Sequence, residues 1–108
     1  MKDPFTPARG MLQMVVPGNL ISTNADQFRT GASSAIEAQS GVSRDWAGIE
    51  IDLTAAQMVD SAGLNALISL IRALKHDGKR VLIHVRNPHV YRVCMFTRLD
   101  SLAEIVRS

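Results

Sequence analysis

The feature that most restricts the fold of this chain is a succession of three sequence patterns in its middle. Ile49, Ile51 and Leu53 alternate with acidic residues, which is the period-two pattern of a strand. Apolar residues then recur at spacings of three and four over residues 64–74, which is the period of an amphipathic helix. A short branched run over residues 81–85 completes the series. A strand, a helix and a strand in this order predict two parallel strands joined by a helix.

Both ends of this helix carry residues that favour helix termini. Asp60 and Ser61 precede the apolar stripe and supply capping oxygens, and Gly78 after it suits a left-handed helix end. The first turn of a helix leaves backbone N–H groups unpaired and carries a partial positive charge, so it favours an anion such as a phosphate. Ser61 is therefore either a structural cap or a hydroxyl that acts as a switch.

The rest of the chain continues the alternation of strands and helices. Residues 11–16 form an apolar, partly branched run closed by a Pro-Gly turn, and they predict a strand. Capping side chains at residues 22–24 predict the start of another helix, whose apolar residues recur at helical spacing until it ends near Gln39. Asn87 followed by proline predicts the start of a further helix. Residues 102–106 are then either a last short strand or the frayed end of a helix.

Length and composition fit a single α/β domain. With 108 residues, 46% of them hydrophobic, the chain is long enough to bury one core but not two. Residues 1–10 contain two prolines and no clear period, so they are predicted to form a loose lead-in that could hold one short edge strand. Residues 11–108 are predicted to form the domain, and the alternation of strands and helices assigns it to the α/β class.

Charge and cysteine content argue against several classes of protein. The formal net charge is +2 and the pI about 9.1, but the basic residues are scattered along the sequence, which argues against nucleic-acid binding. Cys94 is the only cysteine, which excludes an internal disulfide, and we expect it to pack as a small apolar residue in a reducing compartment, the cytoplasm. No apolar run approaches the roughly 18 residues of a membrane span, so no direct membrane insertion is expected.

The sequence offers little support for catalysis or metal binding. Asp52 and Asp60 have no third ligand near them in the sequence, so a carboxylate pair has weak support. Ser61 lacks the flanking glycines of a nucleophile elbow, and no spacing brings a histidine to it as a base. We therefore expect no catalytic residue, no metal site and no cofactor. Structural or surface roles are expected for the three histidines, His76, His84 and His89.

Five segments resemble, in order and spacing, those of the STAS domain family, which is named for sulfate transporters and anti-sigma factor antagonists. The resemblance extends from about Met11 to Leu99. It implies an α/β STAS fold, with a mixed, partly parallel sheet of four to five strands and helices packed against it. The segments are residues 18–20 before a capped helix, 49–54 as a central strand, 60–64 as the signature loop, 78–82 as the turn into the next strand, and 87–93 as the following helix.

The resemblance also implies a regulatory role. Ser61 matches the family's phosphoacceptor serine, Asp60 the acidic residue before it, and Gly63 the small residue that lets the backbone turn. In the bacterial partner-switching members, an anti-sigma factor that is also a serine kinase binds the unmodified protein. Phosphorylation of the serine prevents this binding until a serine phosphatase removes the phosphate. The implied partner-binding residues are Asp60, Ser61, Ala62, Gly63 and Asn65, together with the exposed face of the helix over residues 64–75.

The resemblance leaves other functions open. The family also contains constitutive adaptor subunits of membrane lipid-transport complexes, and modules that sense small ligands or nucleotides. A serine that is never phosphorylated would favour the adaptor, and a nucleotide that raises the melting temperature would favour the sensor. The chain is expected to be non-enzymatic and a monomer or a weak dimer. Arg98 stands where the family usually has glycine.

Overall fold

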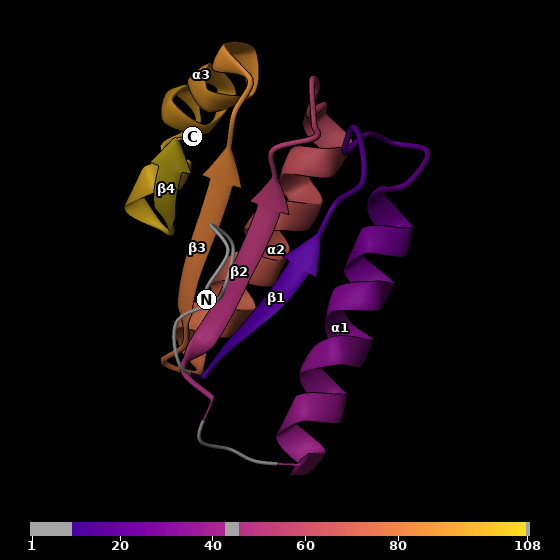
Figure 1. The fold of residues 1–108 in the computed structure, drawn as a ribbon, viewed down its shortest axis with the longest axis vertical. Coiled ribbons are helices and arrows are strands. Elements are labelled where there is room, and N and C mark those ends of the chain that lie inside the picture. Colours follow the sequence, from indigo (N-terminus) through magenta and orange to yellow (C-terminus); the bar gives the residue numbers. More distant parts are fainter. Residues whose placement is uncertain (1–9, 43–45, 108) are drawn as a thin grey trace, which may run out of the picture.

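Parallel strands form the centre of the molecule. The computed structural model describes residues 10–42 and 46–107, and Figure 1 shows their arrangement. The strands lie in the order β1-β2-β3-β4, so neighbours in the sequence are neighbours in the sheet, and every pair is parallel. Each pair therefore needs a crossover connection, which the helices supply. The strands are β1 (Met11–Val15), β2 (Gly48–Leu53), β3 (Arg80–Val85) and β4 (Glu104–Arg107).

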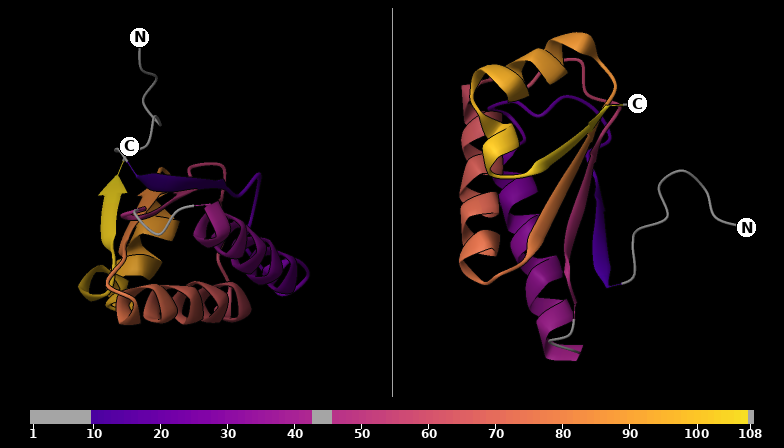
Figure 2. Two further views of the ribbon diagram at one scale, coloured as in Figure 1. Left: turned by 90° about the horizontal axis from the view of Figure 1, so that it is seen from below. Right: turned by 90° about the vertical axis from the view of Figure 1, so that its left-hand side faces the viewer.

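Helices occupy the three connections. Between β1 and β2 lies α1 (Ala25–Val42), between β2 and β3 lies α2 (Ser61–His76), and between β3 and β4 lie α3 (Pro88–Phe96) and the short 3-10 turn η1 (Leu99–Ser101). Figure 2 shows α1 and α2 side by side on one face of the sheet, and α3 across the end at which the strands stop. The carboxyl ends of the strands and all of α3 thus lie at one end of the molecule.

The core lies between the sheet and the helices on its face. Ile49, Ile51 and Leu53 of β2 have no exposed surface, and they belong to one apolar cluster with Leu67 and Ile71 of α2. Fully burying a side chain of this size contributes about 1.5–3 kcal/mol. The apolar stripe predicted from the sequence is therefore what fastens α2 to the sheet, and it fixes the position of the residues at the start of α2.

The alternate residues of β2 are buried as well, although they are acidic. Glu50 and Asp52 are only 6% and 8% exposed. Because side chains alternate along a strand, these two residues point to the face of the sheet opposite to α1 and α2. Glu50 Oε1 lies 2.9 Å from Nε2 of His84 on β3, and Asp52 Oδ1 accepts a 2.8 Å hydrogen bond from the N–H of Thr54. Alternation predicted the strand, but it did not predict this buried contact between Glu50 and His84.

The predicted elements are confirmed, with small differences. The α/β class is confirmed, and the last residues form β4 rather than the frayed end of a helix. The first helix continues to Val42 instead of ending near Gln39. All pairings among the described strands are parallel, where a mixed sheet was expected, because every connection between them is a helical crossover. Apart from Gly10, the lead-in expected over residues 1–10 lies outside the described residues.

Arg98, two residues after the end of α3, has a backbone conformation that favours glycine. Its φ of 57° and ψ of 32° lie in the left-handed region, where a Cβ crowds the neighbouring carbonyl oxygen. Arg98→Gly is therefore expected to stabilise the fold by about 1 kcal/mol and to raise the melting temperature by roughly 4 °C or more. Arg98→Ala keeps the strain, so its melting temperature should stay near that of the wild type. Calorimetry that finds Arg98→Gly no more stable than Arg98→Ala would contradict this explanation.

Candidate functional site

Backbone pairing holds together the two loops that leave β1 and β2. Leu20 forms a parallel bridge with Val59. The N–H of Leu20 donates to the carbonyl of Met58 at 3.1 Å, and the N–H of Asp60 donates to the carbonyl of Leu20 at 3.2 Å. Leu20 has no exposed surface. The segment that leads into α2 is thus fixed to the segment that leads into α1, so α2 begins from a rigid support.

Asn19 adds side-chain bonds to this support. Its Oδ1 accepts from the N–H of Gln57 at 2.8 Å and from the N–H of Met58 at 3.1 Å. Its carbonyl accepts a 2.7 Å bond from Nδ2 of Asn24. The sequence analysis missed this role, because an asparagine in a loop is a common turn residue and nothing local indicates that its partners lie in another loop. Asn19 therefore holds the loop before α2 in one conformation.

Asp60 is the N-cap of α2 and uses both oxygens of its carboxylate. Oδ1 accepts from the N–H of Gly63 at 2.9 Å, which is the usual capping contact. Oδ2 accepts from the N–H of Ser22 at 2.9 Å, which ties the helix start to the loop before α1. These two bonds, with that of Gly63 the larger cause, lower the pKa of the Asp60 carboxyl from its ordinary 3.8. Asp60 is therefore ionised at neutral pH.

This lowered pKa predicts a pH-dependent contribution to stability. The native protein binds the Asp60 proton less readily than the unfolded chain, so the contribution is complete above pH 3.8 and is lost as the pH falls through the lower native pKa. Asp60→Ala is expected to lower the melting temperature at pH 7, and its difference from the wild type should shrink below pH 3.8. Melting curves recorded from neutral to acidic pH test this. A difference that stays constant down to pH 2 would show that the charge of Asp60 does not contribute.

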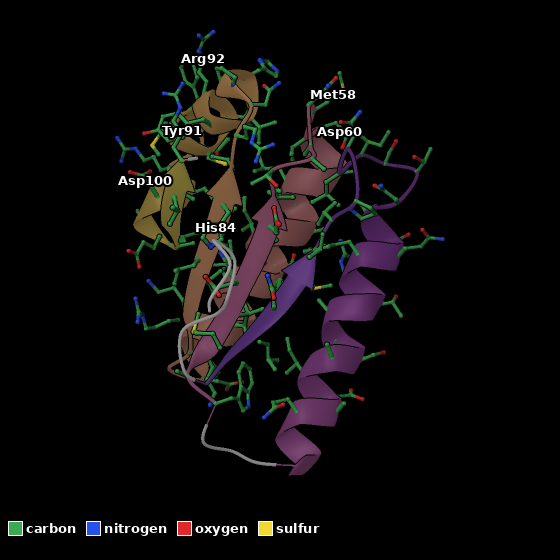
Figure 3. All side chains as sticks on the ribbon, viewed as in Figure 1. Met58, Asp60, His84, Tyr91, Arg92 and Asp100 are labelled. Atoms are coloured by element: carbon green, nitrogen blue, oxygen red, sulfur yellow. The ribbon has the colours of Figure 1, made fainter. Side chains whose placement is uncertain are left out.

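Ser61 is the first residue of α2, and its side chain is exposed. Within residues 10–42 and 46–107, no hydrogen bond holds its hydroxyl. Asp60 provides the cap, so the hydroxyl of Ser61 is accessible from solvent. Asn65, one turn further along α2, is also exposed and lies on the same side of the helix, while Ala62 is half-buried. Figure 3 shows Asp60 and Met58 at the outer end of the molecule.

Gly63 is buried, and close packing rather than a turn explains why it is glycine. Its φ is not in the left-handed region. A Cβ at this position would lie 2.1 Å from the carbonyl oxygen of Leu20, a distance that no neighbour could tolerate without a backbone shift. Of the residues predicted to bind a partner, Ser61 and Asn65 thus present exposed side chains, whereas Gly63 positions them.

The other acidic residues and histidines considered in the sequence analysis do not join Ser61. Asp52 accepts a 2.6 Å bond from the hydroxyl of Thr54, and His84 pairs with Glu50. The carboxylates of Asp52 and Asp60 are each engaged with different partners. The described part of the chain contains no group of three or more His, Cys, Asp or Glu side chains arranged to hold a metal ion.

Cys94 is buried in α3, as predicted for a small apolar residue. Burial, with a smaller effect of the negative charge of Asp100, raises the pKa of its thiol to about 11. The thiolate is the reactive form of cysteine, so at neutral pH Cys94 is protonated and unreactive.

Two hollows described on the surface do not include Ser61. One of about 410 Å³ lies at the opposite end, where Lys75, Arg80 and Glu104 contribute to its wall. The other, of about 250 Å³, is mostly apolar and lies beside Val15 and Phe28. None of the described helices combines the length and the apolar character needed to cross a bilayer.

Comparisons with known proteins identify a family. The family model described as STAS domain matches residues 7–108. A comparison with curated proteins finds no match. Several solved structures share the fold at identities below one fifth.

Two of these structures are described as anti-sigma factor antagonists and one as a transporter domain. A Thermotoga maritima protein assigned as an anti-sigma factor antagonist is 18% identical with a TM-score of 0.79, and the match covers 94% of this chain and 82% of that one. The unphosphorylated form of the anti-sigma factor antagonist SpoIIAA is 18% identical with a TM-score of 0.65, and covers 94% and 82%. The STAS domain of a SulP transporter from Vibrio cholerae is 17% identical with a TM-score of 0.71, and covers 95% and 77%.

Proposed function

This chain belongs to the STAS domain family, and on that premise we propose that it is a non-enzymatic cytoplasmic regulator, similar to an anti-sigma factor antagonist, that is switched by phosphorylation of Ser61. The observation that carries the proposal is an exposed hydroxyl at the first residue of a helix whose cap, Asp60, is already bonded through both oxygens. Two structures of similar fold described as anti-sigma factor antagonists support it. The unmodified protein binds an anti-sigma factor that is also a serine kinase, and a serine phosphatase reverses the modification.

The docking surface in this proposal begins at Ser61 and continues along the exposed side of α2. Asn65 lies one turn from Ser61 on that side, and Ala62 is partly accessible beside it. The hydrogen bonds that Asp60 accepts from Gly63 and Ser22 hold this surface in one conformation. Few groups therefore lose conformational entropy when a partner binds.

A phosphate on Ser61 is expected to change this surface without unfolding the domain. A dianion at the start of a helix meets unpaired N–H groups and the positive end of the helix dipole, which stabilise it. The ionised carboxylate of Asp60 precedes it directly in the chain. A partner surface that fits the neutral hydroxyl then meets two negative groups, so repulsion and the desolvation of charge oppose binding. The partner, not the core, detects the modification.

The state of Ser61 in the source cells tests the proposal. Mass spectrometry of the protein purified from these cells is expected to find phosphate on Ser61. Deleting the gene for the kinase that an immobilised Ser61→Ala chain retains should remove this phosphate. If Ser61 is never phosphorylated, the proposal is wrong and the constitutive adaptor is favoured. A rise in melting temperature with added nucleotide would favour the sensing module instead.

A further inference from the structure

The exposed large hydrophobic side chains of the described residues gather at one end of the molecule. Val15, Met58 and Phe96 are 60%, 50% and 81% exposed. Val15 ends β1, Met58 lies in the loop after β2, and Phe96 ends α3, which follows β3. The carboxyl ends of parallel strands share one edge of a sheet, and Figures 1 and 2 show α3 across that same end. Ser61 begins α2 there too, so the uncovered apolar surface and the proposed switch lie at the same end.

The side of this end formed by α3 is basic. The sequence contains no acidic residue between Asp77 and Asp100. Arg86, Arg92 and Arg98 are exposed, and none of the three forms an ion pair with a residue in the described ranges. Arg92 and Phe96 lie one helical turn apart and are therefore neighbours on the solvent side of α3. Figure 3 shows Arg92 at the outer limit of the molecule.

The left-handed backbone conformation of Arg98 also indicates a function for this side of the molecule. Its φ of 57° suits glycine, yet the residue is an exposed arginine without an ion pair inside the described part of the chain. The backbone of Arg98 forms hydrogen bonds with Met95 and Ser101, but its side chain forms none among the described residues, which is a reason to look for a role of the side chain outside the fold. The side chain of Arg98 contributes a third cation to the surface around Phe96.

We propose that the partner of the Ser61 surface also docks on α3, through a patch of its own that is acidic and encloses a slot for Phe96. Arg86, Arg92 and Arg98 meet the acidic groups, and Phe96 is the apolar anchor. This inference rests on the proposed function, because it assigns both surfaces to one partner protein.

The chemistry of this end favours a protein over a membrane or a nucleic acid. Arginine, aromatic residues and methionine are enriched in protein interfaces, whereas lysine is depleted, and all three unpaired cations here are arginines. The same end also carries the ionised carboxylate of Asp60 beside Ser61. A membrane or a nucleic acid presents negative charge throughout, so one that covered α3 would also bring negative charge close to the carboxylate of Asp60. A protein partner can place acidic groups against α3 and neutral or basic groups against Asp60.

The experiment measures the affinity of one purified partner for a set of variants. The partner is isolated from the source cells on immobilised Ser61→Ala chain, identified by mass spectrometry and then purified alone. Arg92→Glu and Phe96→Ala are each expected to weaken binding about 10-fold or more, and the effect of Arg92→Glu should diminish at high salt. Arg98→Gly should bind several-fold more weakly although its melting temperature rises. Arg29→Glu is the control, because it makes the same charge change on α1 and should bind as the wild type does.

The outcomes separate this inference from the proposed function. If the α3 variants bind like the wild type while Ser61→Asp does not, the extended surface is wrong and the switch stands. If the α3 variants lose affinity and Ser61→Asp does not, the surface stands and the switch is wrong. Failure to retain any protein overturns both. Sedimentation with vesicles of phosphatidylglycerol and phosphatidylcholine, or a shift of a single-stranded RNA, that needs Arg92 would overturn the assignment of α3 to a protein partner.

Discussion

Gly63→Ala is expected to destabilise the domain by about 3 kcal/mol or more, which is a large fraction of the roughly 5–15 kcal/mol by which an ordinary domain is stable. The added Cβ would lie 2.1 Å from the carbonyl oxygen of Leu20 and 2.8 Å from the carbonyl carbon. Both are backbone atoms, so no side-chain rotation relieves the contact. To make room, α2 would have to move away from the bridge between Leu20 and Val59, and the support of Ser61 would move with it.

Gly31→Ala is a matched control for this prediction. Gly31 is also a helical glycine, and a Cβ there would have only Met14 Cε within 4 Å, at an ordinary 3.8 Å. Because alanine favours helices over glycine by about 1 kcal/mol, this variant should be as stable as the wild type or more so. Urea unfolding of both variants measures the two effects. Equal midpoints for Gly63→Ala and the wild type would contradict the close packing of α2 against Leu20.

Ser61→Asp is expected to weaken binding of the partner by about 100-fold or more, while it leaves the domain folded. The variant places a second carboxylate beside that of Asp60 on the docking surface, and an unpaired charge that a partner must desolvate opposes association by several kcal/mol. In the isolated domain, the same charge lies at the favourable end of the α2 dipole, so the free energy of unfolding should change by less than about 1 kcal/mol.

Ser34→Asp supplies the control for the switch. Ser34 is an exposed serine of α1, outside the proposed docking surface, and its replacement makes the same change of charge within a helix. Ser61→Ala removes the hydroxyl without adding charge and should keep the partner. Titration calorimetry compares the variants. If Ser34→Asp binds as weakly as Ser61→Asp, added negative charge on the domain in general explains the loss, and Ser61 has no special position.

Local sequence signals were sufficient for much of the fold. A helix start needs only a capping side chain and its near neighbours, and Asp60 and Asn87 indeed cap α2 and α3. Gly78 has the left-handed φ expected of a residue after a helix. The alternation of Ile49 with Glu50 was enough to predict β2. These elements depend on interactions within a few residues of the chain, which a single sequence records.

The arrangement of the site depends on contacts that the sequence does not record. Ser22 and Asp60 are bonded although 38 residues separate them, and Asn19 reaches Met58 across 39. Glu50 and His84 meet only because β2 and β3 are neighbours in the sheet. Period-two alternation does not show whether the second face of a strand is covered. The resemblance to a family located the Ser61 loop, but not its attachment to the loop before α1.

The same limit applies to α3. Its basic residues are scattered in the sequence, and for that reason they indicated no binding surface. The fold places Arg86, Arg92 and Arg98 at or beside one short helix, at the end of the molecule where Phe96 is exposed. A crossover helix that lies across the strand ends, rather than on a face of the sheet, produces this concentration of charge.

The most direct test of the central claim compares one protein with and without phosphate on Ser61. The chain is produced with phosphoserine incorporated at position 61, and its affinity for the purified partner and its melting temperature are measured beside those of the unmodified chain. The account predicts that binding weakens by about 100-fold or more while the melting temperature remains nearly the same. Equal affinity of the two forms, or a phosphorylated form that is unfolded, would contradict a switch read by the partner at the start of α2.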